Sequence, residues 1–192
     1  MNEQRLTLPV PALVALVGAA GSGKSTLARR LFAPDEILSS DEIRAAISGD
    51  PTDQRATRPA FAILHREAAR RLGDGRLVVV DATNVERAAR RSLLGVSRRA
   101  AVPAIAIVLV PDPRDVHARN AGRHGRVVPR DVVDVHLARL ARLGRDRTTI
   151  AAGLRLEGFA AVHVVGVDDL DPSDIVRIPR RSGDAAADPD RA

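Results

Sequence analysis

The hydrophobic residues of this chain are gathered in short runs, each about the length of one β-strand. The run Ala12–Val17 (ALVALV) contains no charged residue and is followed by a glycine, which is typical of a strand buried on both faces. The same pattern predicts four further strands, of which the first is the weakest: Glu36–Ser39, Leu77–Val80, Ala104–Val110 and Ala161–Gly166.

Between these runs, apolar residues recur every three or four positions, which predicts helices. In Arg58–Leu72 the apolar stripe consists of Phe61, Leu64, Ala68 and Leu72. In Arg130–Arg147 it consists of Val133, Leu137 and Leu140. Because strands alternate with helices, we expect an α/β fold with a five-stranded, mainly parallel sheet covered by helices on both faces.

The length and the distribution of apolar residues indicate one domain. A chain of 192 residues can bury a substantial single core. We expect a flexible N-terminus over residues 1–10, a folded domain over 11–179 and a disordered tail over 180–192, since the final RSGDAAADPDRA offers little to bury.

Composition excludes several kinds of protein. Because the chain has no cysteine, disulfides, thiolate metal sites and cysteine nucleophiles are all excluded. No apolar run approaches the roughly 20 residues that a membrane-spanning helix needs, and the N-terminal MNEQRLTLPV lacks the core of a signal peptide. We therefore expect a cytoplasmic protein with no membrane partner.

The segment GAAGSGKST, residues 18–26, fits the Walker A pattern of a phosphate-binding loop. It follows a predicted strand and opens a predicted helix, which is the context that this motif requires. Its glycines allow successive backbone N–H groups to converge on phosphate oxygens, and the helix N-terminus adds partial positive charge. The expected nucleotide-binding residues of the loop are Gly18, Gly21, Ser22, Gly23, Lys24, Ser25 and Thr26.

Lys24 is the only lysine in a chain whose lysines and arginines together number 30. An ammonium group is a compact charge that can contact two phosphates inside a tight loop, whereas a guanidinium group is a larger planar fork. We therefore predict that Lys24 contacts the β- and γ-phosphates of the nucleotide. A guanine-specific N-K-x-D motif would need a second lysine, so we expect the cofactors to be ATP and Mg²⁺.

Asp81 closes the buried run LVVVD, which resembles a Walker B element. This position places a carboxylate at the carboxyl edge of the sheet, where open parallel sheets bind ligands. We predict that Ser25 and Asp81 help to hold Mg²⁺. Asp81 could instead cap a helix beginning near Val85.

The segment SSDEIR, residues 39–44, follows the second predicted strand and opens a helix. Asp41 and Arg44 are three residues apart and therefore share one helix face. Asp41 could act as a base for a hydroxyl nucleophile, and Arg44 could bind an anionic group of the acceptor. The alternative is a helix cap with an ordinary surface ion pair.

Positive charge is concentrated between Arg114 and Arg147. This segment contains nine arginines and four aspartates, so it accounts for +5 of the net charge of +6. Within it, RNAGRHGR interrupts a helical pattern with two glycines, as a mobile lid over about residues 119–129 would. We expect Arg123 and Arg126 to stabilise the charge of the transferred phosphoryl group, and Arg119 to lie closer to the nucleotide. The alternative is an exposed loop and a solvated helix face.

Four segments together resemble the kinase domain of bacterial and phage-type 5′-polynucleotide kinases, most closely the bacterial polynucleotide kinase-phosphatase type. They are GAAGSGKST, SSDEIR, VVVDATN and ARNAGRHGR, and the resemblance extends from about Pro11 to Val165. It implies a P-loop kinase that transfers the γ-phosphoryl group of ATP to a 5′-hydroxyl end of DNA or RNA.

The same resemblance implies individual roles. Asp41 matches the general base that takes the proton of the 5′-hydroxyl, and Arg44 matches the residue that holds the adjacent phosphate of the acceptor. Arg119 and Arg126 match lid arginines that contact the donor. Members of this family carry a metallophosphatase downstream, whereas these 192 residues end soon after the kinase unit, as an excised domain or a free-standing relative would. Aromatic residues make up only 2% of the chain, so a nucleic-acid acceptor would have to be held mainly by arginines and backbone groups.

Two other functions remain open at the level of sequence. A small-molecule kinase for a sugar, metabolite or antibiotic would share the loop, the base and the lid, and it predicts a closed polar pocket near Asp41. An ATP-dependent switch or binding module would hydrolyse ATP slowly and transfer nothing to a hydroxyl. Arg44 favours an anionic acceptor over a neutral sugar.

Overall fold

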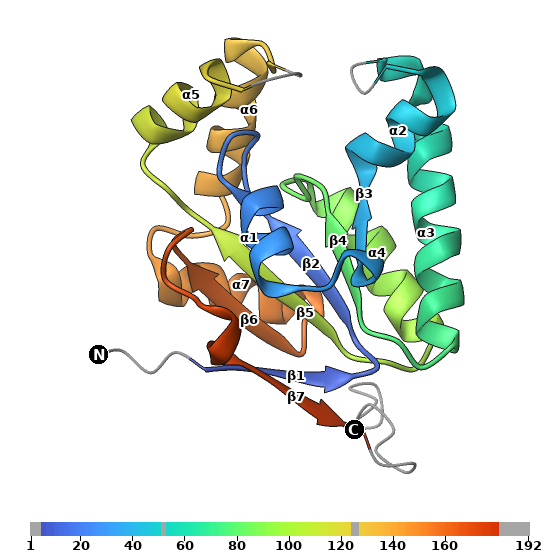
Figure 1. Ribbon diagram of the computed structural model, residues 1–192. Helices are drawn as coiled ribbons and strands as arrows, with labels where there is room; N and C mark the ends of the chain where they lie inside the picture. The colour runs from blue at the N-terminus through green and yellow to red at the C-terminus, as the bar shows by residue number, and fades with distance from the viewer. Residues whose placement is uncertain (1–4, 51–52, 124–126, 181–192) are drawn as a thin grey trace.

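The computed structural model describes residues 5–50, 53–123 and 127–180. A parallel five-stranded sheet forms the centre of this part of the chain (Figure 1). Its strands lie in the order β3 (Ile37–Ser39), β4 (Val78–Asp81), β2 (Leu13–Val17), β5 (Ala104–Leu109) and β6 (Ala161–Val165). The predicted fold class and all five predicted strands are therefore confirmed, with boundaries shifted by one residue at most.

Helices cover both faces of the sheet. On one face lie α3 (Thr57–Gly73), α4 (Arg87–Arg99) and α7 (Arg147–Glu157). On the other lies α1 (Lys24–Leu31). At the carboxyl edge of the sheet, α2 (Ser40–Ser48) stands on one side, with α5 (Pro113–Ala121) and α6 (Arg130–Ala141) on the other (Figure 1). Three short 3₁₀ turns complete the described elements: Pro34–Glu36, Gln54–Ala56 and Pro172–Asp174.

The strand β2 is fully buried, and its side chains alternate between the two cores. Leu13, Ala15 and Val17 pack in the core under α3, α4 and α7, whereas Val14 and Leu16 pack in the core under α1. A strand that is covered on both faces needs apolar residues at every position, which explains why its sequence is a continuous apolar run without alternation. The run ends where the phosphate-binding loop begins.

A second, two-stranded parallel sheet joins β1 (Leu6–Val10) to β7 (Ile175–Pro179). The prediction of a flexible N-terminus over residues 1–10 is wrong for the part that β1 occupies, because Leu6 and Leu8 are fully buried beneath the main sheet. Residues 1–4 and the predicted tail from residue 181 onward lie outside the described residues.

The helix predicted over Arg130–Arg147 is shorter in the structure, and the last residue of that range already belongs to the next helix. The first part of the range is α6, which ends at Ala141, and α7 begins at Arg147. Asp146 caps α7 by accepting a hydrogen bond from the Thr149 N–H at 2.8 Å, while the Thr149 hydroxyl accepts from the Asp146 N–H at 3.1 Å. This reciprocal cap starts a new helix axis, and periodicity alone does not reveal it.

Within the described residues, no helix combines the length and the apolar character that crossing a membrane would require.

Candidate active site

The phosphate-binding loop connects β2 to α1 and depends on glycine at three positions. Gly21 and Gly23 have φ angles of 86° and 94°, in the left-handed region that other residues rarely adopt. Gly18 has no room for a side chain, since a Cβ atom there would lie 2.7 Å from the Ser22 Oγ and 3.1 Å from the Leu109 carbonyl oxygen. The loop conformation therefore requires these glycines.

Lys24 is the first residue of α1, and only 7% of it is exposed. Its Nζ donates hydrogen bonds to the Ala19 carbonyl oxygen at 2.7 Å and to the Ser22 Oγ at 3.3 Å. Burial lowers the pKa of the Lys24 ammonium from 10.5 to about 8, with Asp81 acting against this shift and Arg123 adding to it. The loop therefore holds a buried cation that an anionic ligand would stabilise.

Asp81 ends β4 beside the loop, and 8% of it is exposed. Its carboxylate makes no hydrogen bond or ion pair with the described residues, although it acts electrostatically on Lys24. It does not cap the next helix, because α4 is capped at Glu86. A nearly buried carboxylate without a hydrogen-bond donor, in the same pocket as Ser25, provides hard oxygen ligands that fit Mg²⁺.

The described residues contain no group of three or more histidine, cysteine or acidic side chains that could hold a metal by themselves.

Asp41 and Arg44 lie on α2, which begins directly after β3. Ser39 caps this helix by accepting a hydrogen bond from the Glu42 N–H at 3.3 Å, so Asp41 is not the cap. The Arg44 Nη1 donates to the Asp41 Oδ1 at 2.7 Å. The pair is asymmetric in burial: 46% of the Asp41 side chain is exposed, whereas only 6% of the Arg44 side chain is. It is therefore not the ordinary surface ion pair of the alternative interpretation.

A pocket of about 370 Å³ opens at the carboxyl edge of the sheet. Residues of α2 and α3 line one side of it and residues of α6 the other, in agreement with the placement of these helices in Figure 1. Six residues that the sequence predicted for the site line this pocket: Lys24, Ser25, Asp41, Arg44, Asp81 and Arg123. Thr26, on the first turn of α1, is exposed and does not line it.

Arg119 lies on α5, outside the pocket lining. Its Nη1 would be 3.5 Å from a Cβ atom placed on Gly23, so the guanidinium lies beside the phosphate-binding loop. Among the described residues, its side chain forms a single long ion pair, with Asp115 at 3.7 Å. The side chain is therefore positioned to approach a nucleotide in the loop.

The predicted lid begins in α5 and ends before α6. Asn120 joins its two ends, because the Asn120 Nδ2 donates to the Val128 carbonyl oxygen at 2.7 Å and the Asn120 Oδ1 accepts from the Val128 N–H at 3.2 Å. Arg123 lines the pocket and is close enough to Lys24 to affect its pKa. Arg126 lies outside the described residues.

Three further residues of the pocket did not stand out in the sequence. Phe61, which the helical pattern counted among the core positions of α3, is half-buried and lines the pocket. His136 of α6 also lines the pocket, and its Nδ1 accepts a hydrogen bond from the Ala20 N–H at 3.5 Å. Asn84 has a φ of 47° and donates from Nδ2 to the Leu16 carbonyl oxygen at 2.8 Å. Asn84 is the last residue of the motif VVVDATN. Its position shortly after a predicted buried strand is the sequence signal that could have identified it as a residue of the site.

Several solved structures share this fold. A chain of the Pnkp1/Rnl/Hen1 RNA repair complex is 20% identical with a TM-score of 0.60, and the match covers 69% of this chain but only 45% of that one. Kti12 from Chaetomium thermophilum, solved with ADP-AlF3, is 20% identical with a TM-score of 0.59, covering 84% and 92% of the two chains. A gluconokinase from Sinorhizobium meliloti 1021 is 18% identical with a TM-score of 0.53, covering 85% and 89%.

At these identities the structural matches show a common fold and leave the acceptor open. No curated protein matches the sequence. A family model described as an AAA domain matches residues 13–143, which include the phosphate-binding loop, both candidate carboxylates and the predicted lid. On this match over most of its length, the chain belongs to the AAA_33 family of AAA domains and has a P-loop kinase-like fold.

Proposed function

We propose that this protein is an ATP-dependent kinase that transfers the γ-phosphoryl group to a 5′-hydroxyl end of a polynucleotide. The observation that carries the proposal is the Asp41–Arg44 pair, which lines the same pocket as Lys24. The exposed carboxylate of Asp41 is accessible to a hydroxyl group, and the buried guanidinium of Arg44 provides positive charge on the acceptor side. An anionic acceptor such as the 5′ end of a nucleic acid uses that charge, whereas a neutral sugar does not.

In the proposed reaction, the oxygen of the 5′-hydroxyl attacks the γ-phosphorus in line with the bond to the β–γ bridging oxygen, which breaks. Asp41 accepts the proton of the hydroxyl. Lys24 and the backbone N–H groups of the loop bind the β- and γ-phosphates, and Lys24 must be protonated to do so. Arg123, with Arg119 beside the loop, would stabilise charge on the transferred group, and Arg126 is proposed for the same role from the family resemblance.

Ser25 and Asp81 are the residues that would hold Mg²⁺. When bound, the ion would neutralise charge on the β- and γ-phosphate oxygens. Asp81 also raises the pKa of Lys24, which keeps that side chain charged near neutral pH.

The shape of the pocket provides space for a nucleoside next to this pair. Phe61 lies on α3 and Val132 lies on α6, and both line the pocket. They offer apolar contacts to a sugar or a base, and Phe61 is an aromatic side chain in a chain that has very few.

A small-molecule kinase is the second candidate. The volume of about 370 Å³ is sufficient for a metabolite, and the gluconokinase fold neighbour is named for a sugar substrate. The buried Arg44 favours a phosphorylated or otherwise anionic metabolite over a neutral one.

The test is transfer of labelled γ-phosphate from ATP to 5′-hydroxyl DNA, 5′-hydroxyl RNA, nucleosides and sugars in parallel, with Lys24→Ala as the blank. Transfer to oligomers that is absent in the blank supports the proposal. Labelling of a sugar or nucleoside in preference to every oligomer would replace it with the metabolite kinase, and ATP hydrolysis without any acceptor would favour a switch.

Asp41→Asn tests the assignment of the base. The change preserves the size of the side chain and its position beside Arg44 but removes its basicity, so we expect phosphoryl transfer to fall by at least about 10²-fold. Binding of ATP, measured by equilibrium titration, should stay within a few-fold of the wild type. A turnover number equal to that of the wild type would remove Asp41 as the base.

A further inference from the structure

One face of α4 carries exposed arginines that the proposed active site does not use. Arg87, Arg91 and Arg98 line a shallow groove of about 170 Å³ together with residues of α7. One of these, Leu156, is 90% exposed. We call this surface, formed by Arg87, Arg91, Arg98 and Leu156, the basic groove.

The positive charge of this groove exceeds its negative charge, because three arginines and one acidic residue, Glu157, line it. The helix contains five arginines and no acidic residue: Arg87, Arg90, Arg91, Arg98 and Arg99. The Arg90 Nε and Nη2 each donate a hydrogen bond of 2.7 Å to the carboxylate of Glu157. That carboxylate is therefore already engaged, and Arg87 reaches it only at 3.9 Å.

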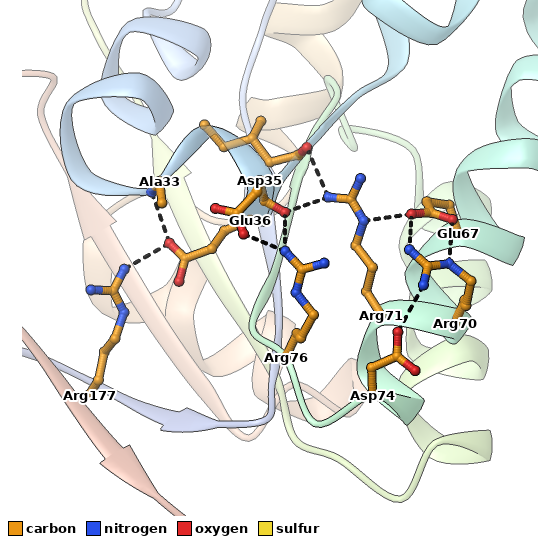
Figure 2. Close-up of polar contacts among 10 residues, drawn as sticks. Ala33, Asp35, Glu36, Glu67, Arg70, Arg71, Asp74, Arg76 and Arg177 are labelled. Carbon is orange, nitrogen blue, oxygen red and sulfur yellow. Dashed lines mark hydrogen bonds and ion pairs between the residues drawn. The ribbon is translucent and has the colours of Figure 1, made fainter.

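Some arginines elsewhere in the protein are paired with acidic side chains, as Figure 2 shows for the C-terminal end of α3. There the Arg70 side chain contacts Glu67 and Asp74, and Arg71 contacts Glu67, at 2.7–2.9 Å. By contrast, the side chains of Arg91 and Arg98 form no hydrogen bond or ion pair with any described residue.

Arg87 and Arg91 act against the stability of their own helix. Arg87 lies in the first turn, where the helix dipole favours negative charge, and it repels Arg91 one turn later. Each effect is on the order of a few tenths of a kcal/mol. A bound polyanion would remove both penalties.

The basic groove adjoins the candidate active site. Glu86, the cap of α4, and Ala89 in its first turn line the active-site pocket, while Arg87 lines the groove. From Arg87 to Arg98 the helix rises by about 16 Å. This length corresponds to roughly five phosphates of a stacked nucleic-acid strand at about 3.4 Å each.

We infer that the basic groove binds the phosphate backbone of the acceptor strand beyond its 5′-terminal nucleotide. This inference rests on the proposed function, because it assigns the groove to the same substrate. The three guanidinium groups contact phosphates, and Leu156 offers an apolar contact to an unstacked base. Acceptors long enough to reach the groove bind more tightly than those that occupy only the pocket.

The test compares a 5′-hydroxyl dinucleotide with a 5′-hydroxyl 12-mer in the variant Arg87→Gln/Arg91→Gln/Arg98→Gln. We expect the KM for the 12-mer to rise at least tenfold, with kcat and the KM for the dinucleotide unchanged. Since each phosphate contact contributes about 0.7 to the salt slope of single-strand binding, the slope of log KM against log salt should fall by about 2.

The matched control is Arg5→Gln/Arg66→Gln/Arg142→Gln, which removes the same charge from exposed arginines that do not line the groove. An equal rise in KM in this control would show a general charge effect and would overturn the inference, as would an unchanged KM in the groove variant. An acidic protein segment would then be the other ligand to examine at the groove.

Failure of the proposed function gives a different result. If the wild type labels neither acceptor, the kinase proposal fails, and the groove is then tested by equilibrium binding of the 12-mer in fluorescence anisotropy. Loss of binding in the groove variant but not in the control would support the groove as a nucleic-acid surface. Equal binding in both would overturn it.

Discussion

Lys24 is a buried cation in the phosphate-binding loop. Because its pKa falls from 10.5 to about 8 on folding, the charged lysine lowers the free energy of unfolding by about 3 kcal/mol at neutral pH. Functional sites often hold charge against the preference of the fold, because the ligand then supplies the missing partner. The chain also lacks cysteine and tyrosine, so no side chain other than Lys24 has an ordinary pKa between about 8 and 11.

This composition allows a direct measurement of the Lys24 pKa. Below about pH 8 the lysine is charged in both the folded and the unfolded state, and its burial cost is fully present. Between about 8 and 10.5 the folded state loses the proton first, so stability rises with pH. We expect the free energy of urea-induced unfolding of the wild type to increase by about 3 kcal/mol, relative to Lys24→Met, between pH 7.5 and pH 11.

A constant difference between the wild type and Lys24→Met across this range would mean that the lysine is not desolvated. Arg66→Gln, on the exposed surface, serves as a control that should show no such pH dependence.

At the level of elements, a buried ion pair between Arg90 and Glu157 stabilises the loop between β4 and α4. The Arg90 Nη1 donates to the carbonyl oxygens of Asn84 and Val85 at 3.0 and 2.8 Å, and Arg90 is 1% exposed. On its other side, Arg90 is paired with Glu157 of α7. The same loop contacts the phosphate-binding loop, where the Gly18 N–H donates to the Thr83 carbonyl oxygen at 2.9 Å. Helix α7 thus supports the active site without touching it.

Glu157→Gln should destabilise the protein strongly, because it leaves the Arg90 guanidinium buried without a carboxylate. We expect a loss of about 3–5 kcal/mol in the free energy of unfolding. In Asp74→Asn, an exposed ion pair with Arg70 is removed instead, and the loss should be at most about 1 kcal/mol. The free energy of unfolding of each variant is measured by chemical denaturation. Equal losses of unfolding free energy in the two variants would contradict a supporting role for the Arg90–Glu157 pair.

For the whole molecule, the sheet formed by β1 and β7 joins the two ends of the described chain. Leu6 pairs with Ile175 at one end of the ladder and Val10 with Pro179 at the other. One side of this sheet contributes Leu6 and Leu8 to the core under α1, while the other side is exposed. The strand β1 therefore packs against the core between α1 and the main sheet and covers part of it.

Leu8→Ala should cost about 2–5 kcal/mol of unfolding free energy, because it opens a cavity in that core. Ile178→Ala lies in the neighbouring strand of the same sheet, where the side chain is 49% exposed, and should cost much less. Thermal unfolding of both variants provides the measurement. Similar losses would mean that β1 adds little to the core.

Much of the fold and of the loop could be predicted because the relevant signals are local. The continuous apolar runs of β2, β4 and β5 reflect strands covered on both faces, and GAAGSGKST contains the glycines that its turns require. Neither signal depends on a distant part of the chain. Asp41, Arg44 and Asp81 were found in the same way, because each follows a strand and must lie at the carboxyl edge of a parallel sheet.

The sequence by itself therefore determined the fold class, the five central strands and the residues that surround the phosphate-binding loop. Only the tertiary structure decided that β1 pairs with β7, that Phe61 faces the pocket and that Arg90 connects Glu157 to the loop after β4. These features join residues far apart in the chain, and they form because packing the helices on the sheet determines which buried groups meet. No local pattern specifies such a partner, since apolar periodicity identifies a buried face but not what covers it.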